Sequence, residues 1–231
     1  ELVDVRVYPQ DVDLATQRDR QSLVVQAIYD DGVTVDVTDQ SKFTFADPKL
    51  VKFEGHTVYP AADGQTQLTI EHAGHKMQVP VSVKDASKDR PISFKLDVMP
   101  VFMKAGCNTG SCHGAARGKD GFMLSLFGYD PNGDWHRITK EMAGRRINLA
   151  LPRQSLLLEK GVGKVNHTGG ELFTEDSELY HTVLRWLEAG APKDGDDIAK
   201  PLSIEVLPNR IVLEGEDSTQ RLVVRAKYSD G

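Results

Sequence analysis

One stretch of this chain occurs twice, and the two copies are separated by sequence of a different kind. Residues 5–32 match residues 204–231 without a gap. In both copies apolar, often β-branched residues alternate with polar ones, and a proline and an Asp-Gly pair mark turns. Such alternation predicts β-strands with one buried face. Since similar segments fold alike, we expect two related β-structures with a separate unit between them.

The first copy continues into more strand-like sequence. Short runs of alternating residues recur at even spacing, with turn residues between them, at 34–38, 43–45, 50–53, 57–59, 67–70 and 77–83. This spacing predicts an antiparallel β-sandwich over residues 1–86. The pattern of Pro9, Ala27, Tyr29 and the Asp31-Gly32 turn resembles bacterial immunoglobulin-like (group 2) domains of surface and exported proteins.

The second copy stops at Gly231, at the tip of its first hairpin. Two or three strands are too few to bury the core of a sandwich. Residues 201–231 are therefore predicted to be the first strands of a second, truncated immunoglobulin-like domain. We expect this tail to be poorly ordered, or to pair with a neighbouring sheet edge or with another chain.

Between the copies, residues 92–196 show helical rather than strand periodicity. Asp97, Asp134 and Ser177 each precede an apolar stripe and are candidate helix caps. The stripe after Ser177 is the strongest, and Gly190 ends it. The predicted fold class is thus multidomain: an all-β immunoglobulin-like sandwich, then a mainly α domain, then the first strands of the truncated second repeat.

The middle segment contains both cysteines of the chain, Cys107 and Cys112, and a histidine, His113, follows the second directly. Covalent haem attachment needs this order, because two thiols bond to the porphyrin and the next side chain binds the iron. The usual motif has two residues between the cysteines, and this loop has two more.

Other chemistries compete for the same residues. A short disulfide between Cys107 and Cys112 would suit an exported chain. A zinc site could use both cysteines, His113 and a distant histidine, but the second clustered ligand pair usual for structural zinc is missing. A redox dithiol normally has a shorter spacing beside a βαβ pattern, which this sequence lacks.

Further motifs favour haem. They are Cys107 to Ala115, Gly121 to Pro131, Ser155 to Leu158, His167 to Phe173, and Trp186 to Pro192. Together they resemble the cytochrome domains of large planctomycete surface proteins, across nearly all of 92–193. The resemblance implies a cytochrome c-like domain over 92–196 that binds one haem c per chain through Cys107 and Cys112, with His113 as the proximal iron ligand.

The sixth iron position sets the chemistry of such a site. In related small cytochromes a methionine precedes the last helix, and here His167 stands in that stretch. His167 is therefore the expected distal ligand, and an ordinary loop histidine is the alternative. Met123 and Met142 lie in apolar stripes typical of core residues.

Apolar side chains should line the haem and lower the local dielectric constant. The candidates are Phe122, Leu124, Leu126, Leu156, Leu157 and Trp186. Arg145, Arg146 and Arg153 are either partners of the haem propionates or surface charges, and the sequence leaves this open.

Two histidine ligands would fill the iron coordination sphere, which favours electron transfer over catalysis. We therefore expect an electron-transfer protein with an unidentified redox partner protein, and no enzymatic activity in this segment. A haem sensor or peroxidase with an open sixth position is an alternative. A haem-free adhesive fragment with a disulfide is another.

Composition narrows the setting. The net charge of −6 argues against binding to nucleic acid. No apolar run is long enough to cross a bilayer. The first residues already read as folded sequence, so we expect a mature or excised chain. Because c-type cytochromes are assembled outside the cytoplasm, the resemblance implies export to the periplasm or cell surface.

Overall fold

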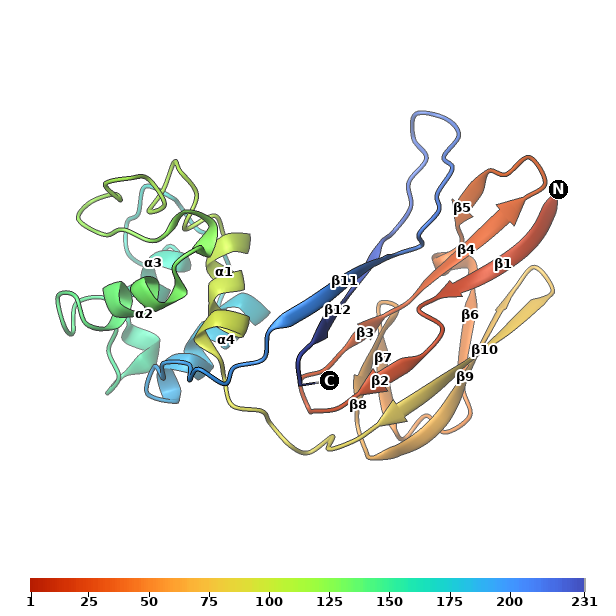
Figure 1. The fold of residues 1–231 in the computed structure, drawn as a ribbon, viewed down its shortest axis with the longest axis horizontal. Coiled ribbons are helices and arrows are strands. Elements are labelled where there is room, and N and C mark those ends of the chain that lie inside the picture. Colours follow the sequence, from red (N-terminus) through yellow and green to blue (C-terminus); the bar gives the residue numbers. More distant parts are fainter. Residues whose placement is uncertain (231) are drawn as a thin grey trace. The chain divides into compact units, whose positions relative to one another are not determined.

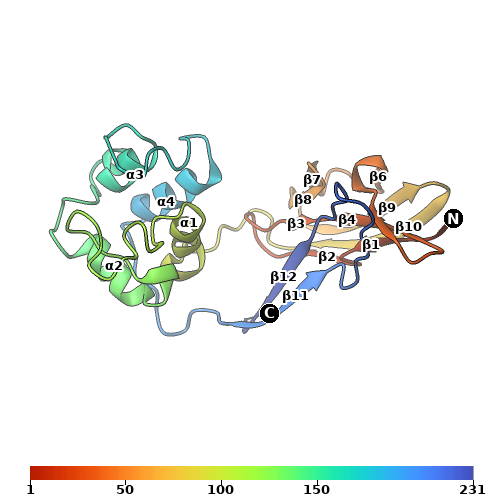
Figure 2. The ribbon, with the colours of Figure 1, turned by 90° about the horizontal axis from the view of Figure 1, so that it is seen from above.

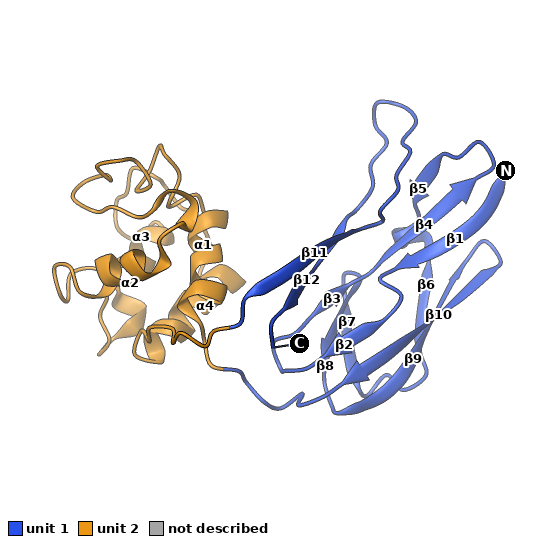
Figure 3. Ribbon diagram, viewed as in Figure 1, with its two compact units in different colours: residues 1–90, 199–231 blue, residues 91–198 orange. Residues whose placement is uncertain are grey.

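The computed structural model describes residues 1–230, which form two compact units. Residues 1–90 and the segment from residue 199 onward make up the first unit, and residues 91–198 make up the second (Figure 3). Strands occupy the first unit, and every α-helix lies in the second (Figures 1 and 2).

The first unit contains the predicted strands, which form three sheets before residue 90. The strands are β1 (Leu2–Tyr8), β2 (Val12–Leu14), β3 (Gln21–Ser22), β4 (Val24–Tyr29), β5 (Thr34–Asp36), β6 (Lys42–Phe45), β7 (Val51–Glu54), β8 (Thr57–Pro60), β9 (Gly64–His72) and β10 (His75–Val83). Their orders are β1-β4-β5, β2-β10-β9-β6 and β3-β8-β7. All neighbours are antiparallel except β2 and β10.

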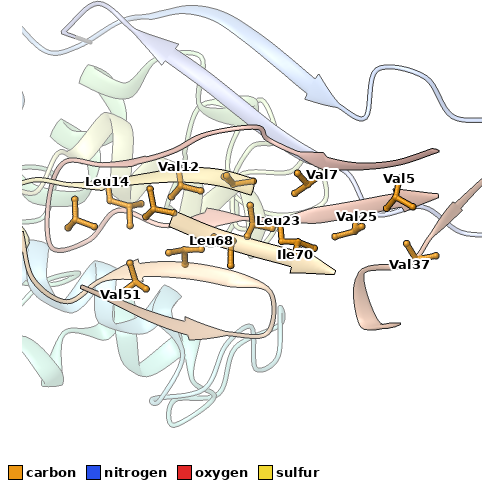
Figure 4. Packing of buried hydrophobic residues seen from close by; sticks show 14 of the residues in the cluster. Val5, Val7, Val12, Leu14, Leu23, Val25, Val37, Val51, Leu68 and Ile70 are labelled. Atoms are coloured by element: carbon orange, nitrogen blue, oxygen red, sulfur yellow. The ribbon is translucent and has the colours of Figure 1, made fainter. Parts of the chain in front are cut away.

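Alternate residues of these strands point into one core. Val5 and Val7 of β1 and Val25 of β4 meet Leu68 and Ile70 of β9 there (Figure 4). The intervening residues Asp4 and Arg6 stay at the surface and bond to each other. Because successive side chains of a strand point to opposite faces, the alternating sequence gives each strand one buried face and one solvated face.

The C-terminal segment forms a hairpin of β11 (Pro201–Leu207) and β12 (Val223–Tyr228). It also pairs with the edge of the first sheet, since the N–H of Thr34 donates to the carbonyl of Val212 over 2.8 Å. The N–H of Val212 donates in turn to the hydroxyl of Thr34 over 3.0 Å. The edge strand β5 thereby gains a partner.

Residues 91–198 contain four short helices and their own core. The helices are α1 (Met99–Lys104), α2 (Pro131–Thr139), α3 (Leu156–Gly161) and α4 (Glu178–Glu188), and a π-helical turn, η2 (Phe94–Val98), leads into α1. Phe94, Phe102 and Trp186 lie at the centre of this core. Turns and irregular backbone connect the helices.

The predicted fold class is wrong, because the described chain has more strand than helix and its middle segment is not mainly α. Strands account for 29% of the residues, whereas helices account for 20% and are all short. The longest helix, α4, has 11 residues. Glycines with positive φ, such as Gly106, Gly118, Gly121 and Gly128, break the chain before α2 into turns instead of helix. The segment does not form a mainly α cytochrome domain.

Two of the three predicted helix caps are wrong, because another residue caps the helix. Ser93 caps the first helical segment, because its hydroxyl accepts from the N–H of Leu96, and Asp97 bonds back to the N–H of Ser93. Asp130, not Asp134, caps α2. The prediction for Ser177 is confirmed, since its hydroxyl accepts from the N–H of Tyr180 at the start of α4.

Within residues 1–230, none of the helices has the length and apolar character that crossing a bilayer requires.

Candidate metal and cofactor site

A cavity of about 260 Å³ lies in the unit formed by residues 91–198. The loop that carries the cysteines, the start of α3 and the loop around His167 all contribute to its wall. Its apolar and aromatic lining residues are Phe102, Phe122, Leu124, Met142, Leu156, Leu157, Leu172, Phe173 and Val183. A mostly apolar cavity with a few polar groups is typical of a cofactor site.

The cysteine loop is a compact turn that continues from α1. The N–H of Cys107 donates to the carbonyl of Phe102, and the N–H of His113 donates to the carbonyl of Cys107. A Cβ atom on Gly114 would lie 2.1 Å from the carbonyl oxygen of Asn108. Glycine after the histidine is therefore required by the close approach of two backbone segments.

His113 has a defined orientation on the cavity wall. Its Nδ1 lies 3.0 Å from the carbonyl oxygen of Phe122, which can only accept, so Nδ1 carries the proton. The Nε2 atom then has a free lone pair, which is the form that binds a metal ion. Burial lowers the pKa of His113. The hydrogen bond to Phe122 partly offsets this shift, and the nearby His167 adds to it, so that the pKa stays below its ordinary value and the neutral ring is favoured.

His167 reaches the same cavity from a distant part of the sequence. Its ring centroid lies 6.2 Å from that of His113, and the two ring planes differ by only 10°. A Cβ atom on Gly169 would lie 2.7 Å from the ring of His167. The glycine therefore provides the room that this ring position needs.

The spacing of the two rings fits two imidazoles that share one metal ion. An imidazole nitrogen binds a metal ion at about 2 Å, which places the centroids of two opposed ligands about 6.3 Å apart. In the described residues, no three His, Cys, Asp or Glu side chains gather closely enough to hold a metal ion. A porphyrin needs only two axial ligands from the protein, whereas structural zinc needs four.

Both cysteines are free thiols in this structure. Cys107 lines the cavity, whereas Cys112 does not. Burial raises the pKa of Cys107 to about 11, with a smaller contribution from Cys112. The thiol of Cys107 is therefore protonated at neutral pH and resists adventitious oxidation.

The other candidate lining residues fall into two groups. Phe122, Leu124, Leu156 and Leu157 border the cavity together with Cys107, His113 and His167.

Leu126 and Trp186 lie elsewhere. Leu126 is 42% exposed on a short turn. Trp186 is fully buried against Phe94, and its indole N–H donates to the carbonyl of Pro192. Trp186 is therefore a core residue, and neither side chain lines the cavity.

Arg146 is a site residue whose role the sequence left open. Its guanidinium group donates to the carbonyl oxygens of Arg137, Glu141 and Gly121. It also lies over the ring of Phe122, 4.4 Å from the centroid. Because Phe122 contacts His113, Arg146 supports the wall behind that histidine.

Sequence reasoning missed several lining residues. Lys119, Lys160, Phe102 and Phe173 are among them. A Cβ atom on Gly161 would lie 2.4 Å from the Phe173 ring, so the ring packs directly on α3. No local pattern marks these residues, because each reaches the cavity only through the tertiary fold.

Comparison of the chain with models of protein families and with curated proteins found no match.

Proposed function

We propose that residues 91–198 bind one haem covalently through Cys107 and Cys112, with His113 and His167 as the two axial iron ligands. The chain then acts as a single-haem electron-transfer module of a larger exported protein. The observation that carries this proposal is the pair of near-parallel histidine rings, 6.2 Å apart on one cavity.

The residues of the chain have separate tasks in this proposal. His113 presents Nε2 because its Nδ1–H donates to the carbonyl oxygen of Phe122. Phe122, Leu124 and Leu157 keep water from the site and lower its dielectric constant. Cys107 supplies a protonated thiol at the cavity wall for a thioether bond.

A bound haem supplies iron that changes between the ferric and ferrous states, and therefore takes up and releases one electron. Two imidazole ligands favour a lower reduction potential than a histidine–methionine pair. His167 would hold the iron from the second side and so keep small molecules from the metal, which favours electron transfer over catalysis.

Export follows from the same proposal, because thioether bonds to haem are made outside the cytoplasm in c-type cytochromes. The resemblance of the cysteine loop and later motifs to planctomycete cytochrome domains supports both the cofactor and this location.

The first test is haem staining of the denatured protein, produced in the periplasm of a host that matures c-type cytochromes. We expect the stain to stay with the chain, and to be lost in the Cys107→Ser, Cys112→Ser double variant. A colourless chain with free or disulfide-bonded cysteines would overturn the proposal.

The second test concerns the sixth ligand. We expect a low-spin spectrum from the unmodified protein and a high-spin ferric spectrum from His167→Ala, with haem still attached. The matched control is His181→Ala, since His181 is exposed on α4 and does not line the cavity. A high-spin spectrum before substitution would instead support a sensor or peroxidase with an open sixth position.

A further inference from the structure

The hairpin β11–β12 presents an apolar face to solvent. Ile204 and Val206 of β11 are 68% and 45% exposed, and Val224 of β12 is 62% exposed. Val206 is paired with Val224, and Ile204 with Ala226, so these side chains share one face. Soluble domains seldom leave such a continuous apolar face uncovered.

The internal repeat shows what this face corresponds to. Ile204, Val206 and Val224 match Val5, Val7 and Val25 in the first copy. Those three valines are at most 6% exposed and lie in the core of the sandwich.

The sheet that covers them in the first copy contains β9 and β10. Leu68 and Ile70 of β9, with Val79 and Val81 of β10, belong to the same buried cluster as Val5, Val7 and Val25. The exposed residues of β11–β12 therefore occupy positions that a second sheet covers in the first copy.

The opposite face of the hairpin is buried at one end. Leu207 and Val223 pack against Tyr8 and Val24. In the alignment of the copies Leu207 matches Tyr8 and Val223 matches Val24, so each copy contributes the same two positions.

The polar contacts around this patch have the same symmetry. Arg225 forms two bonds with Asp11, at 2.9 and 3.0 Å. In the alignment of the copies Arg225 matches Gln26, and Asp11 matches Arg210. This second pair is also in contact, because the side chain of Gln26 donates to the carbonyl of Arg210. The two copies thus contact each other through their equivalent outer faces, which leaves the inner face of the second copy free.

We infer that the exposed face of β11–β12 is the inner face of a second sandwich. Its occupant is a β-sheet with an alternating apolar face like that of β9–β10. The residue-by-residue equivalence with a buried core face favours this occupant over a ligand or an unrelated protein surface.

The experiment supplies such a sheet to the chain. A second copy of residues 33–86 is appended directly after residue 231, where the alignment of the repeats places it. We expect dye binding by exposed apolar surface to fall, and amide exchange in β11–β12 to slow at least about tenfold, because the hairpin becomes part of a cooperative core.

The matched control carries Leu68→Asp and Ile70→Asp in the appended copy alone, so that this sheet cannot cover the face. We expect no protection of β11–β12 in that protein. As a second variant, Ile204→Asp should leave the 231-residue chain as stable as before but destabilise the extended chain.

Two results would overturn the inference. One is an extended chain whose β11–β12 amides exchange as fast as those of the control. The other is self-association of the 231-residue chain that Ile204→Asp abolishes, because a second copy of the chain would then be the occupant.

Discussion

Gly114 follows His113, and its backbone passes the carbonyl of Asn108 so closely that no side chain fits. The neighbouring Gly110 has open space around it, although it belongs to the same loop. Two neighbouring arginines also differ in their surroundings. Arg146 is buried and donates to backbone carbonyls, whereas Arg145 is exposed. At the residue scale, surroundings decide what each side chain does.

Gly114→Ala is expected to destabilise the second unit. The added Cβ would lie 2.1 Å from a carbonyl oxygen, so the loop must shift, at a cost of about 1–3 kcal/mol. Urea unfolding of the unmodified and variant proteins measures this difference. Gly110→Ala is the control and should be nearly neutral, and equal losses in both variants would contradict the expected steric cause.

Arg146→Met should also lower stability. Removing the guanidinium group takes hydrogen bonds from the carbonyls of Arg137, Glu141 and Gly121, which costs about 1–3 kcal/mol when such groups stay buried. Thermal unfolding followed by circular dichroism measures the change. Arg145→Met should unfold at the same temperature as the unmodified protein, because Arg145 is exposed.

At the scale of elements, the ends of helices and the edges of sheets hold this chain together. Ser177 caps α4, and the carboxylate of Asp194 accepts from the N–H groups of Phe94 and Lys95 at the start of η2. The hairpin β11–β12 is held to the first sheet partly by ion pairs of Arg221 with Asp36 and Asp39. The cap is local, whereas the contacts of Asp194 and Arg221 join segments that are distant in sequence.

Ser177→Ala should destabilise α4 by about 1 kcal/mol, because the N–H of Tyr180 loses its acceptor. Ser177→Asp retains an acceptor and should restore most of the loss. Chemical denaturation of the three proteins provides the comparison, and an alanine variant as stable as the serine protein would show that the cap contributes nothing.

The ion pairs of the hairpin predict a dependence on pH. Arg221 and, to a smaller extent, His56 hold the pKa of Asp39 below its ordinary value of 3.8. A lowered pKa in the folded state stabilises it above pH 3.8, and this contribution disappears as the pH falls through the folded-state value.

Asp39→Asn should therefore speed amide exchange in β11–β12 at neutral pH, relative to the unmodified protein. The difference should shrink in strong acid, and also in 1 M salt because the pair is exposed. Exchange measured by mass spectrometry provides the test. A difference that persists unchanged in acid would contradict the ionic explanation.

At the scale of the whole molecule, the chain divides into units with separate cores. The buried cluster of residues 5–83 and that of residues 91–198 share no residue. The second unit also closes on itself, since Asp194 bonds to the first turn at Phe94 and the indole of Trp135 donates to the carbonyl of Ala191.

Residues 91–198 should therefore fold when expressed alone, with a single cooperative unfolding transition. A shorter fragment, 91–190, lacks Ala191, Pro192 and Asp194, and is expected to be markedly less stable. Calorimetry of both fragments tests this, and an unfolded 91–198 fragment would show that the unit depends on the strands around it.

The strands of the first copy and the helix cap at Ser177 could be predicted from periodicity and local chemistry in the sequence. Both features depend on residues that are close together in the chain. The repeat between residues 5–32 and 204–231 was also visible in the sequence. The prediction of a mainly α middle segment was wrong, because its helices are short and glycine turns separate them.

The alternating strands, the repeat and the order of Cys107, Cys112 and His113 can be read from the amino-acid order alone. Long-range packing is needed to bring the ring centroid of His167 to 6.2 Å from that of His113, and to place Arg146 over Phe122. It also places Leu126 and Trp186 away from the cavity. The physical reason is distance along the chain. Local patterns report the contacts of neighbours, whereas a cavity wall is assembled by the packing of segments far apart in sequence.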